Sequence, residues 1–199
     1  MLRWIGGCAV VAIVLVALGM CFGYRKINDM AAEGPGEAII VHAAAPRVFA
    51  MVAHAESLPE WRMEGLGIRA SRPGMLEVGD SLIAENRSGP RPMRSVWHVS
   101  AVVPNVLIAF QVRTDTGSVM AVRTDSVIAL GDSTRIVSSV AATMIDSIRA
   151  QRPDTGVETA ITNMTSKIFV AAARMQTRAE LQRLKARVEG DSTANRARP

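Results

Sequence analysis

The side chains that most often carry chemistry are few in this sequence and widely spaced. None of the three histidines, His42, His54 and His98, has a partner at metal-ligand spacing, and the His54–Glu56 pair lacks the cysteine motif of a zinc deaminase. No phosphate-binding loop, dinucleotide-binding glycine motif or nucleophile elbow occurs. We therefore expect no metal, no cofactor and no catalytic residue that the sequence alone identifies.

Cysteine usage and charge exclude further classes of function. Both cysteines, Cys8 and Cys21, lie in an apolar N-terminal segment, so the remaining chain offers no thiolate nucleophile and no disulfide framework. The formal net charge is +5, but the two ends carry it: residues 1–26 contribute +3 and residues 174–199 contribute +4. Residues 27–173 are left at −2, so we expect no nucleic-acid partner.

Small hydroxyls make up the more informative group of polar residues. Strand alternation over residues 119–130 predicts that Arg123 and Asp125 point outward. The opposite, inward side chains are then Met120, Val122, Thr124, Ser126, Ile128 and Leu130. The same reasoning turns Ile108, Phe110 and Val112 inward in residues 107–114, and Ile136, Ser138, Val140, Ala142 and Met144 inward in residues 134–144.

Buried hydroxyls cost free energy unless they are paired. Thr124, Ser126 and Ser138 therefore either bond nearby backbone or face a wet or ligand-filled cavity, and the sequence leaves both readings open. Trp61 and Trp97 carry the same ambiguity, because each could line a pocket or fill the core.

An antiparallel sheet is predicted to position these side chains. Six strands separated by turn signals are expected at residues 67–72, 81–87, 94–103, 107–114, 119–130 and 134–144. Their short loops allow only antiparallel neighbours, and residues 38–42 add a seventh strand. Two helices are expected between the first two strands, one beginning near Pro46 and one at 57–61.

The C-terminal region changes to a helical period over residues 157–189, a length of about 45 Å. The repeating apolar positions are Val157, Ile161, Met164, Ile168, Ala171, Met175 and Ala179, followed by Leu184 and Val188. With Met120 and Met144 opposite, Met164 and Met175 suit an adaptable pocket wall, although core packing is the default reading.

The N-terminal segment is predicted to be an uncleaved membrane anchor. Residues 5–23 run nineteen positions without a charge, enough for about 28 Å of helix, and Arg25-Lys26 follow. We therefore expect a single-pass protein of the cell membrane, with anchor and flanks at 1–26, a linker at 27–36 and a disordered tail at 190–199. Basic residues on the two sides balance, so the orientation stays open.

The local sequence resembles the opening of the START-like superfamily, also called SRPBCC. Members commonly carry Ala-Pro before the first helix and tryptophan at the end of the second, as Ala45-Pro46 and Trp61 do here. The resemblance covers residues 37–189. It implies the α+β helix-grip fold, in which a seven-stranded antiparallel sheet wraps around a long C-terminal helix and encloses an apolar cavity for lipids, polyketides or other hydrophobic molecules.

These observations favour a membrane-anchored domain that binds a hydrophobic small molecule or lipid without covalent chemistry. The candidate ligand-binding residues are Trp61, Trp97, Phe110, Met120, Thr124, Ser126, Ser138, Met164 and Ile168.

A polyketide cyclase/dehydratase-like enzyme is the alternative, and it requires an ionisable side chain in the cavity. The side chains predicted to point inward from residues 107–114, 119–130 and 134–144 include no ionisable group. A protein-interaction module is the third reading, which a filled interior and an exposed apolar patch would favour. The oligomeric state stays open.

Overall fold

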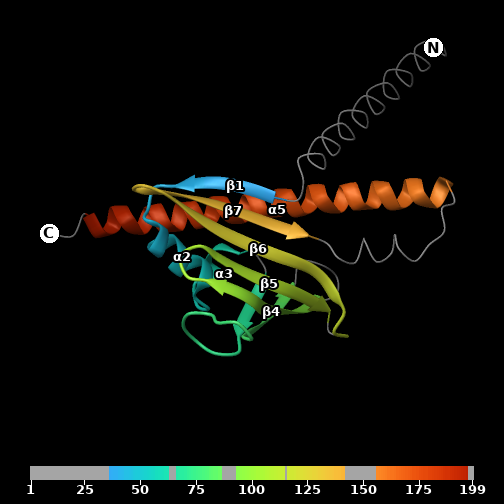
Figure 1. The fold of residues 1–199 in the computed structure, drawn as a ribbon, viewed down its shortest axis with the longest axis horizontal. Coiled ribbons are helices and arrows are strands. Elements are labelled where there is room, and N and C mark those ends of the chain that lie inside the picture. The colour runs from blue at the N-terminus through green and yellow to red at the C-terminus, as the bar shows by residue number, and fades with distance from the viewer. Residues whose placement is uncertain (1–35, 63–65, 87–92, 115, 142–155, 197–199) are drawn as a thin grey trace, which may run out of the picture.

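A seven-stranded antiparallel sheet, two short helices and one long helix make up the described chain (Figure 1). The computed structural model describes residues 36–62, 66–86, 93–114, 116–141 and 156–196. The strands are β1 (Gly36–Val41), β2 (Leu66–Ala70), β3 (Ser81–Asn86), β4 (Met93–Val103), β5 (Leu107–Thr114), β6 (Val119–Leu130) and β7 (Ser133–Ala141). The helices are α2 (Ala45–Ala53), α3 (Leu58–Trp61) and α5 (Gly156–Arg196).

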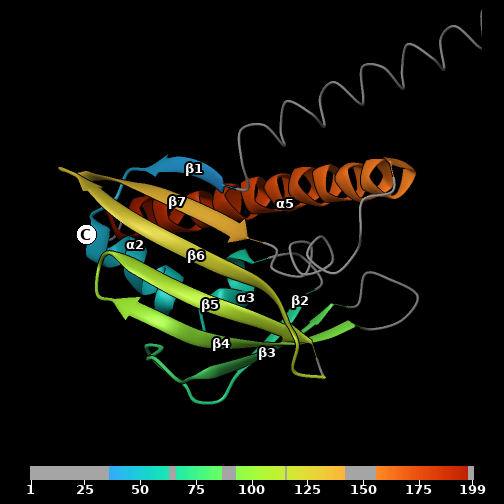
Figure 2. The same cartoon turned by 45° about the vertical axis from the view of Figure 1, so that its right-hand side comes forward.

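The sheet is a meander closed at one edge by the first strand. Strands β2 to β7 lie in chain order, and β1 pairs antiparallel with β7, so that Ile39 lies opposite Ile136. Helices α2 and α3 contact the sheet, and α5 contacts β1, β7 and both short helices (Figure 2). This arrangement confirms the predicted helix-grip architecture with its seven antiparallel strands.

The two short helices form where the sequence predicts them. Pro46 falls in the first turn of α2 and Pro59 in the first turn of α3, where a missing N–H leaves no helical hydrogen bond unmade. Trp61 at the end of α3 is fully buried, and its Nε1 donates to the Met51 carbonyl at 3.0 Å. This hydrogen bond satisfies the indole and ties α3 to α2.

The predicted inward face is right for β5 and β7 but wrong for β6. Ile108, Phe110, Ile136 and Ser138 are fully buried, as expected. On β6 the buried side chains are Ala121, Arg123, Asp125 and Val127, whereas Ile128 and Leu130 are 45% and 47% exposed.

The strand register explains the reversal on β6. Residues directly opposite in an antiparallel pair share a face, and Phe110 lies opposite Arg123 while Ser138 lies opposite Asp125. The two charged residues therefore point into the interior, and Thr124 and Ser126 point to the other side of the sheet.

The predicted apolar face of α5 is wrong for most of its middle part, although Ala171 is buried as expected. Met164, Ile168 and Met175 are 54%, 45% and 57% exposed, and Ala179 is exposed as well. Helix α5 instead packs with a side that includes Thr177, Glu180, Leu181, Leu184 and Val188. At 3.6 residues per turn, this buried side lies roughly opposite the methionine positions.

Helix α5 is longer than predicted and reaches beyond the sheet. Its C-terminal half lies against β1, α2 and α3, while its N-terminal end extends past the sheet (Figures 1 and 2). The helix continues to Arg196, so residues 190–196, predicted as part of a disordered tail, are helical. Met144, predicted to point inward from the last strand, lies outside the described residues.

The predicted membrane anchor at residues 5–23 lies outside the described residues and stays a prediction. Within residues 36–62, 66–86, 93–114, 116–141 and 156–196, no helix is long and apolar enough to cross a bilayer.

Burial along α5 makes the first testable prediction. Leu184→Ala removes a fully buried side chain and should lower the free energy of unfolding by about 2–5 kcal/mol. Met175→Ala, on the exposed side of the same helix, should change it by less than about 0.5 kcal/mol. Urea unfolding of the full-length chain, followed by the fluorescence of buried Trp61 and Trp97, measures both. Equal losses would contradict this packing of α5.

Candidate functional site

A cavity of ≈ 280 Å³ lies between the sheet and α5. This volume is near the lower end of the range of about 300–1,000 Å³ for small-molecule pockets. The lining residues are Trp97, Val112, Met120, Ala121, Arg123, Val140, Phe169, Ala172, Ala173, Gln176 and Thr177. The walls are therefore mostly apolar, with one charged and two neutral polar side chains.

The sheet side of the cavity is built from β4, β5, β6 and β7. Trp97 on β4 is held in place by an edge-to-face contact with Phe110, with ring centroids 5.8 Å apart, and by donation from its Nε1 to the Ser95 hydroxyl at 3.0 Å. With its N–H satisfied, the indole can offer its apolar surface to the cavity.

Met120 reaches the cavity because of a β-bulge. Val112 pairs with Ala121 and Arg113 pairs with Val119, so Met120 has no partner on β5. A bulge changes the direction of the side chains near it. Met120 therefore lines the cavity even though strict alternation places it on the opposite face from Ala121.

The helix side of the cavity owes its space to small residues. Ala172 and Ala173 face the opening where larger side chains would fill it, and Gln176 and Thr177 follow one turn later. Phe169 lines the cavity and is 41% exposed, so it lies where the cavity meets solvent.

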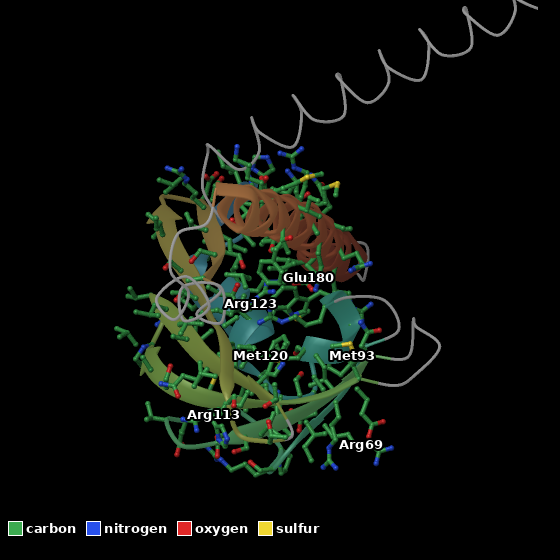
Figure 3. All side chains as sticks on the ribbon, turned by 90° about the vertical axis from the view of Figure 1, so that its right-hand side faces the viewer. Arg69, Met93, Arg113, Met120, Arg123 and Glu180 are labelled. Atoms are coloured by element: carbon green, nitrogen blue, oxygen red, sulfur yellow. The ribbon has the colours of Figure 1, made fainter. Side chains whose placement is uncertain are left out.

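A buried cluster of four charged residues lies behind the cavity wall. Arg62 follows α3, Arg123 and Asp125 are on β6, and Glu180 is on α5; none is more than 3% exposed. Asp125 Oδ2 accepts from Nη2 of Arg62 at 2.8 Å, and Nη1 of Arg123 lies 2.8 Å from Oε2 of Glu180. Figure 3 shows Arg123 and Glu180 facing each other between the sheet and α5. The cluster therefore joins three elements that are distant in the sequence.

Further contacts complete this four-residue cluster. Nη1 of Arg62 lies 3.6 Å from Oε2 of Glu180, and Arg123 also contacts Asp125 at 3.3 Å. Ser138 donates its hydroxyl to Asp125 and accepts from Nη2 of Arg123 at 3.0 Å. Two cations and two anions thus balance, which is the condition under which charges can be buried.

Three aromatic rings surround the guanidinium of Arg62. Its central carbon lies 4.0 Å from the ring centroid of Trp61, 5.5 Å from that of Trp97 and 5.7 Å from that of Phe110. The negative ring faces attract a cation, and the planar guanidinium stacks well against aromatic groups. Trp97 consequently separates Arg62 from the cavity that it lines.

Asp125 and Arg123 stay ionised near neutral pH. Burial alone would raise the pKa of Asp125, but the charges of Arg123 and Arg62 and the Ser138 hydrogen bond outweigh it and hold that pKa well below its ordinary range. Burial would lower the pKa of Arg123, but Asp125 and Glu180 raise it overall. Arg123, the single charged residue among the described residues of the cavity lining, is therefore a permanent cation and not a proton donor or acceptor near neutral pH.

The structure brings together part of the predicted site. Trp97 and Met120 line the cavity, while Trp61, Phe110 and Ser138 are fully buried around the charged cluster. Thr124 and Ser126 lie on the opposite face of β6 from Arg123, because the phase predicted for that strand is wrong. Met164 and Ile168 are exposed on α5 for the reason given above.

Sequence reasoning missed the charged cluster and the helical wall. Arg123 and Asp125 carry opposite charges two positions apart on one strand, a spacing that allows them to pair on either face. The partners Arg62 and Glu180 are 61 and 57 positions away from Arg123 and have no local signal. The run Ala171–Ala173 is a local signal of a thin part of the helix that the sequence analysis did not use. Among the described residues, no group of histidine, cysteine, aspartate and glutamate could hold a metal ion.

Comparisons with known proteins support the fold. A START superfamily protein from Mycobacterium smegmatis matches with a TM-score of 0.50 and 20% identity over 78% of this chain and 96% of that one. A Chromobacterium violaceum protein matches with 0.52 and 15% identity over 77% and 95%. DynU16, from the dynemicin biosynthetic locus, matches with 0.50 and 16% identity over 77% of this chain and 46% of its own. The chain thus has a START-like (SRPBCC-like) fold.

No protein-family model and no curated protein matches the chain at a significant level.

The charged cluster makes a prediction about stability. Asp125→Asn leaves Arg62 and Arg123 buried together with one carboxylate, so the free energy of unfolding should fall by about 3–5 kcal/mol. The matched control is Asp132→Asn, an exposed aspartate in the turn after β6, which should change little. Urea unfolding of the full-length variants compares them. An unaffected Asp125→Asn protein would contradict the ion pairing described here.

The same pair of proteins makes a prediction about pH. The pKa of Asp125 is lower in the folded chain than in the unfolded chain, so its ionised form stabilises the fold fully above the unfolded value. The stability difference between wild type and Asp125→Asn should be constant above about pH 5 and shrink as the pH falls below about 4. A difference that grows on acidification would contradict the assigned direction.

Proposed function

We propose that this protein binds an uncharged hydrophobic small molecule or a single lipid chain in the cavity between the sheet and α5, without covalent chemistry. The observation that carries this proposal is the lining itself, which is mostly apolar and is kept open by Ala172 and Ala173 on the helix side. The START-like fold supports it, because such folds suggest a hydrophobic ligand. Held at a membrane by residues 5–23, the domain would lie next to a supply of such molecules.

Charge balance in the cavity wall favours an uncharged ligand. Arg123 already contacts Asp125, Ser138 and Glu180, and the four-residue cluster has no net charge. A ligand carboxylate near Arg123 would therefore compete with the carboxylates of Asp125 and Glu180, which are buried. A neutral apolar molecule leaves the cluster intact, and Gln176 and Thr177 offer it neutral hydrogen-bonding groups.

The cyclase-like alternative gains one observation from the structure. It requires an ionisable group in the cavity, and Arg123 lies there, contrary to the predicted phase of β6. Three other ionisable strand residues that could serve this chemistry do not line the cavity: His98, Glu85 and Arg113. Because Arg123 stays protonated, it could polarise a carbonyl group but could not abstract a proton. The described lining residues therefore offer one element of such chemistry and no general base, and we favour binding.

The third hypothesis, a protein-interaction module, receives less support from the cavity. It requires a cavity that is filled, whereas ≈ 280 Å³ remains open beside Trp97 and Phe169.

Filling the cavity tests the proposal. Ala173→Phe places a ring in the space beside α5 and should weaken the binding of a neutral apolar probe such as N-phenyl-1-naphthylamine at least about tenfold, or 1.4 kcal/mol. Ala179→Phe adds the same ring to an exposed position of α5 and should leave binding unchanged. Fluorescence titration of the full-length chains measures the affinity, and thermal unfolding checks that both variants are folded. Equal affinity in folded variants would contradict binding in this cavity.

The charge of the ligand gives an independent test of whether the cavity prefers neutral molecules. Decanol should bind at least about tenfold more tightly than decanoate at neutral pH, because the carboxylate meets Glu180 and Asp125 as well as Arg123. Competition of each compound against the neutral probe measures the ratio. Tighter binding of decanoate would show that Arg123 is available to an acidic ligand and would overturn this part of the proposal.

A further inference from the structure

The polar side chains of the cavity wall lie together, around the carboxylate of Glu180. Nη1 of Arg123 lies 2.8 Å from Oε2 of Glu180, and Nε2 of Gln176 donates to Oε1 at 3.1 Å. Thr177 lies three positions before Glu180, which makes the two neighbours on the surface of α5. Phe169, eight positions before Thr177, lies about 12 Å away along the axis of α5. Among the described lining residues, the polar side chains are therefore concentrated at one end of the cavity.

The charged and amide groups at this end are already oriented by the protein. The guanidinium of Arg123 is engaged by Asp125, Ser138 and Glu180. Because a carboxylate accepts and does not donate, the bond to Glu180 fixes the amide of Gln176 with its nitrogen toward Glu180 and its carbonyl oxygen away from it. The carbonyl oxygen, an acceptor, is therefore the part of this amide that Glu180 leaves for a ligand.

The hydroxyl of Thr177 depends on the cavity more than Gln176 does. Thr177 lines the cavity and is 1% exposed, whereas Gln176 is exposed and can be hydrated from solvent. A threonine hydroxyl in a helix can donate to the carbonyl four positions earlier, here that of Ala173, and it can still accept a bond. An apolar ligand that displaces water from the cavity would leave this acceptor unpaired, which is unfavourable for a buried polar group. A ligand that carries a hydrogen-bond donor avoids this loss.

We propose that the ligand of this cavity is a neutral alcohol, whose hydroxyl donates to Thr177 and whose apolar part extends toward Phe169. This inference rests on the proposed function and names the chemical class that the cavity selects. Ketones, esters and ethers accept hydrogen bonds but do not donate them, so they would leave the Thr177 hydroxyl without a partner for its acceptor positions. Thr177 is then the residue that determines specificity, and the carbonyl oxygen of Gln176 is a second acceptor beside it.

Two isomers test the need for a donor. Decan-1-ol and 1-methoxynonane have the same atomic composition, but only the alcohol can donate a hydrogen bond. Each competes with the probe N-phenyl-1-naphthylamine on the full-length wild-type chain, on Thr177→Val and on Thr124→Val. Valine keeps the branched shape of threonine and removes the hydroxyl. Thr124 is the matched control, because it lies on the opposite face of β6 from the cavity-lining Arg123.

We expect the wild-type chain to bind decan-1-ol at least about fivefold more tightly than the ether, because the alcohol makes one more hydrogen bond. This ratio should fall to about two or less in Thr177→Val and stay at the wild-type value in Thr124→Val. A general disturbance of the cavity would weaken both isomers and would not remove the preference between them. Equal affinities of the isomers for the wild type, or an unchanged ratio in Thr177→Val, would overturn the alcohol proposal and leave binding in the cavity intact. Failure of the probe to bind any of the three chains would overturn both.

Discussion

The buried cluster of Arg62, Arg123, Asp125 and Glu180 is the interaction on which the rest of the structure depends. Each charge would be costly alone in the interior, and the four are tolerated because two cations meet two anions at short range. The members come from the end of α3, from β6 and from α5, so the cluster forms only when all three elements are in place. Aromatic rings around Arg62 close it against water.

This cluster also defines the cavity. Arg123 and Trp97 belong to the cavity wall on one side and to the surroundings of the charges on the other. The bulge at Met120 and the two alanines of α5 then leave an apolar space in front of them. Helix α5 packs against the sheet and the short helices with its C-terminal half and lines the cavity with its middle part.

Much of the architecture could be predicted from local sequence signals. Pro46, Pro59 and the short turns between the strands determine where elements begin and how neighbours pair. The orientation of β6 could not be predicted in this way, because charged side chains usually point to solvent. Here Arg62 and Glu180, which are distant in the sequence, pair with the charged residues of β6 and allow them to be buried. The face of α5 was mistaken for a related reason: Met164, Ile168 and Met175 keep a helical period, but period alone does not say which of two apolar sides meets the sheet. Both errors concern contacts between residues far apart in the chain.

The central claim is that the cavity holds an uncharged apolar molecule, and native mass spectrometry of the purified full-length chain tests it most directly. We expect one bound molecule per chain that is retained after bulk lipid is removed and is neutral once released. A chain that carries no such molecule, and that takes up none from a panel of neutral apolar compounds, would contradict the claim.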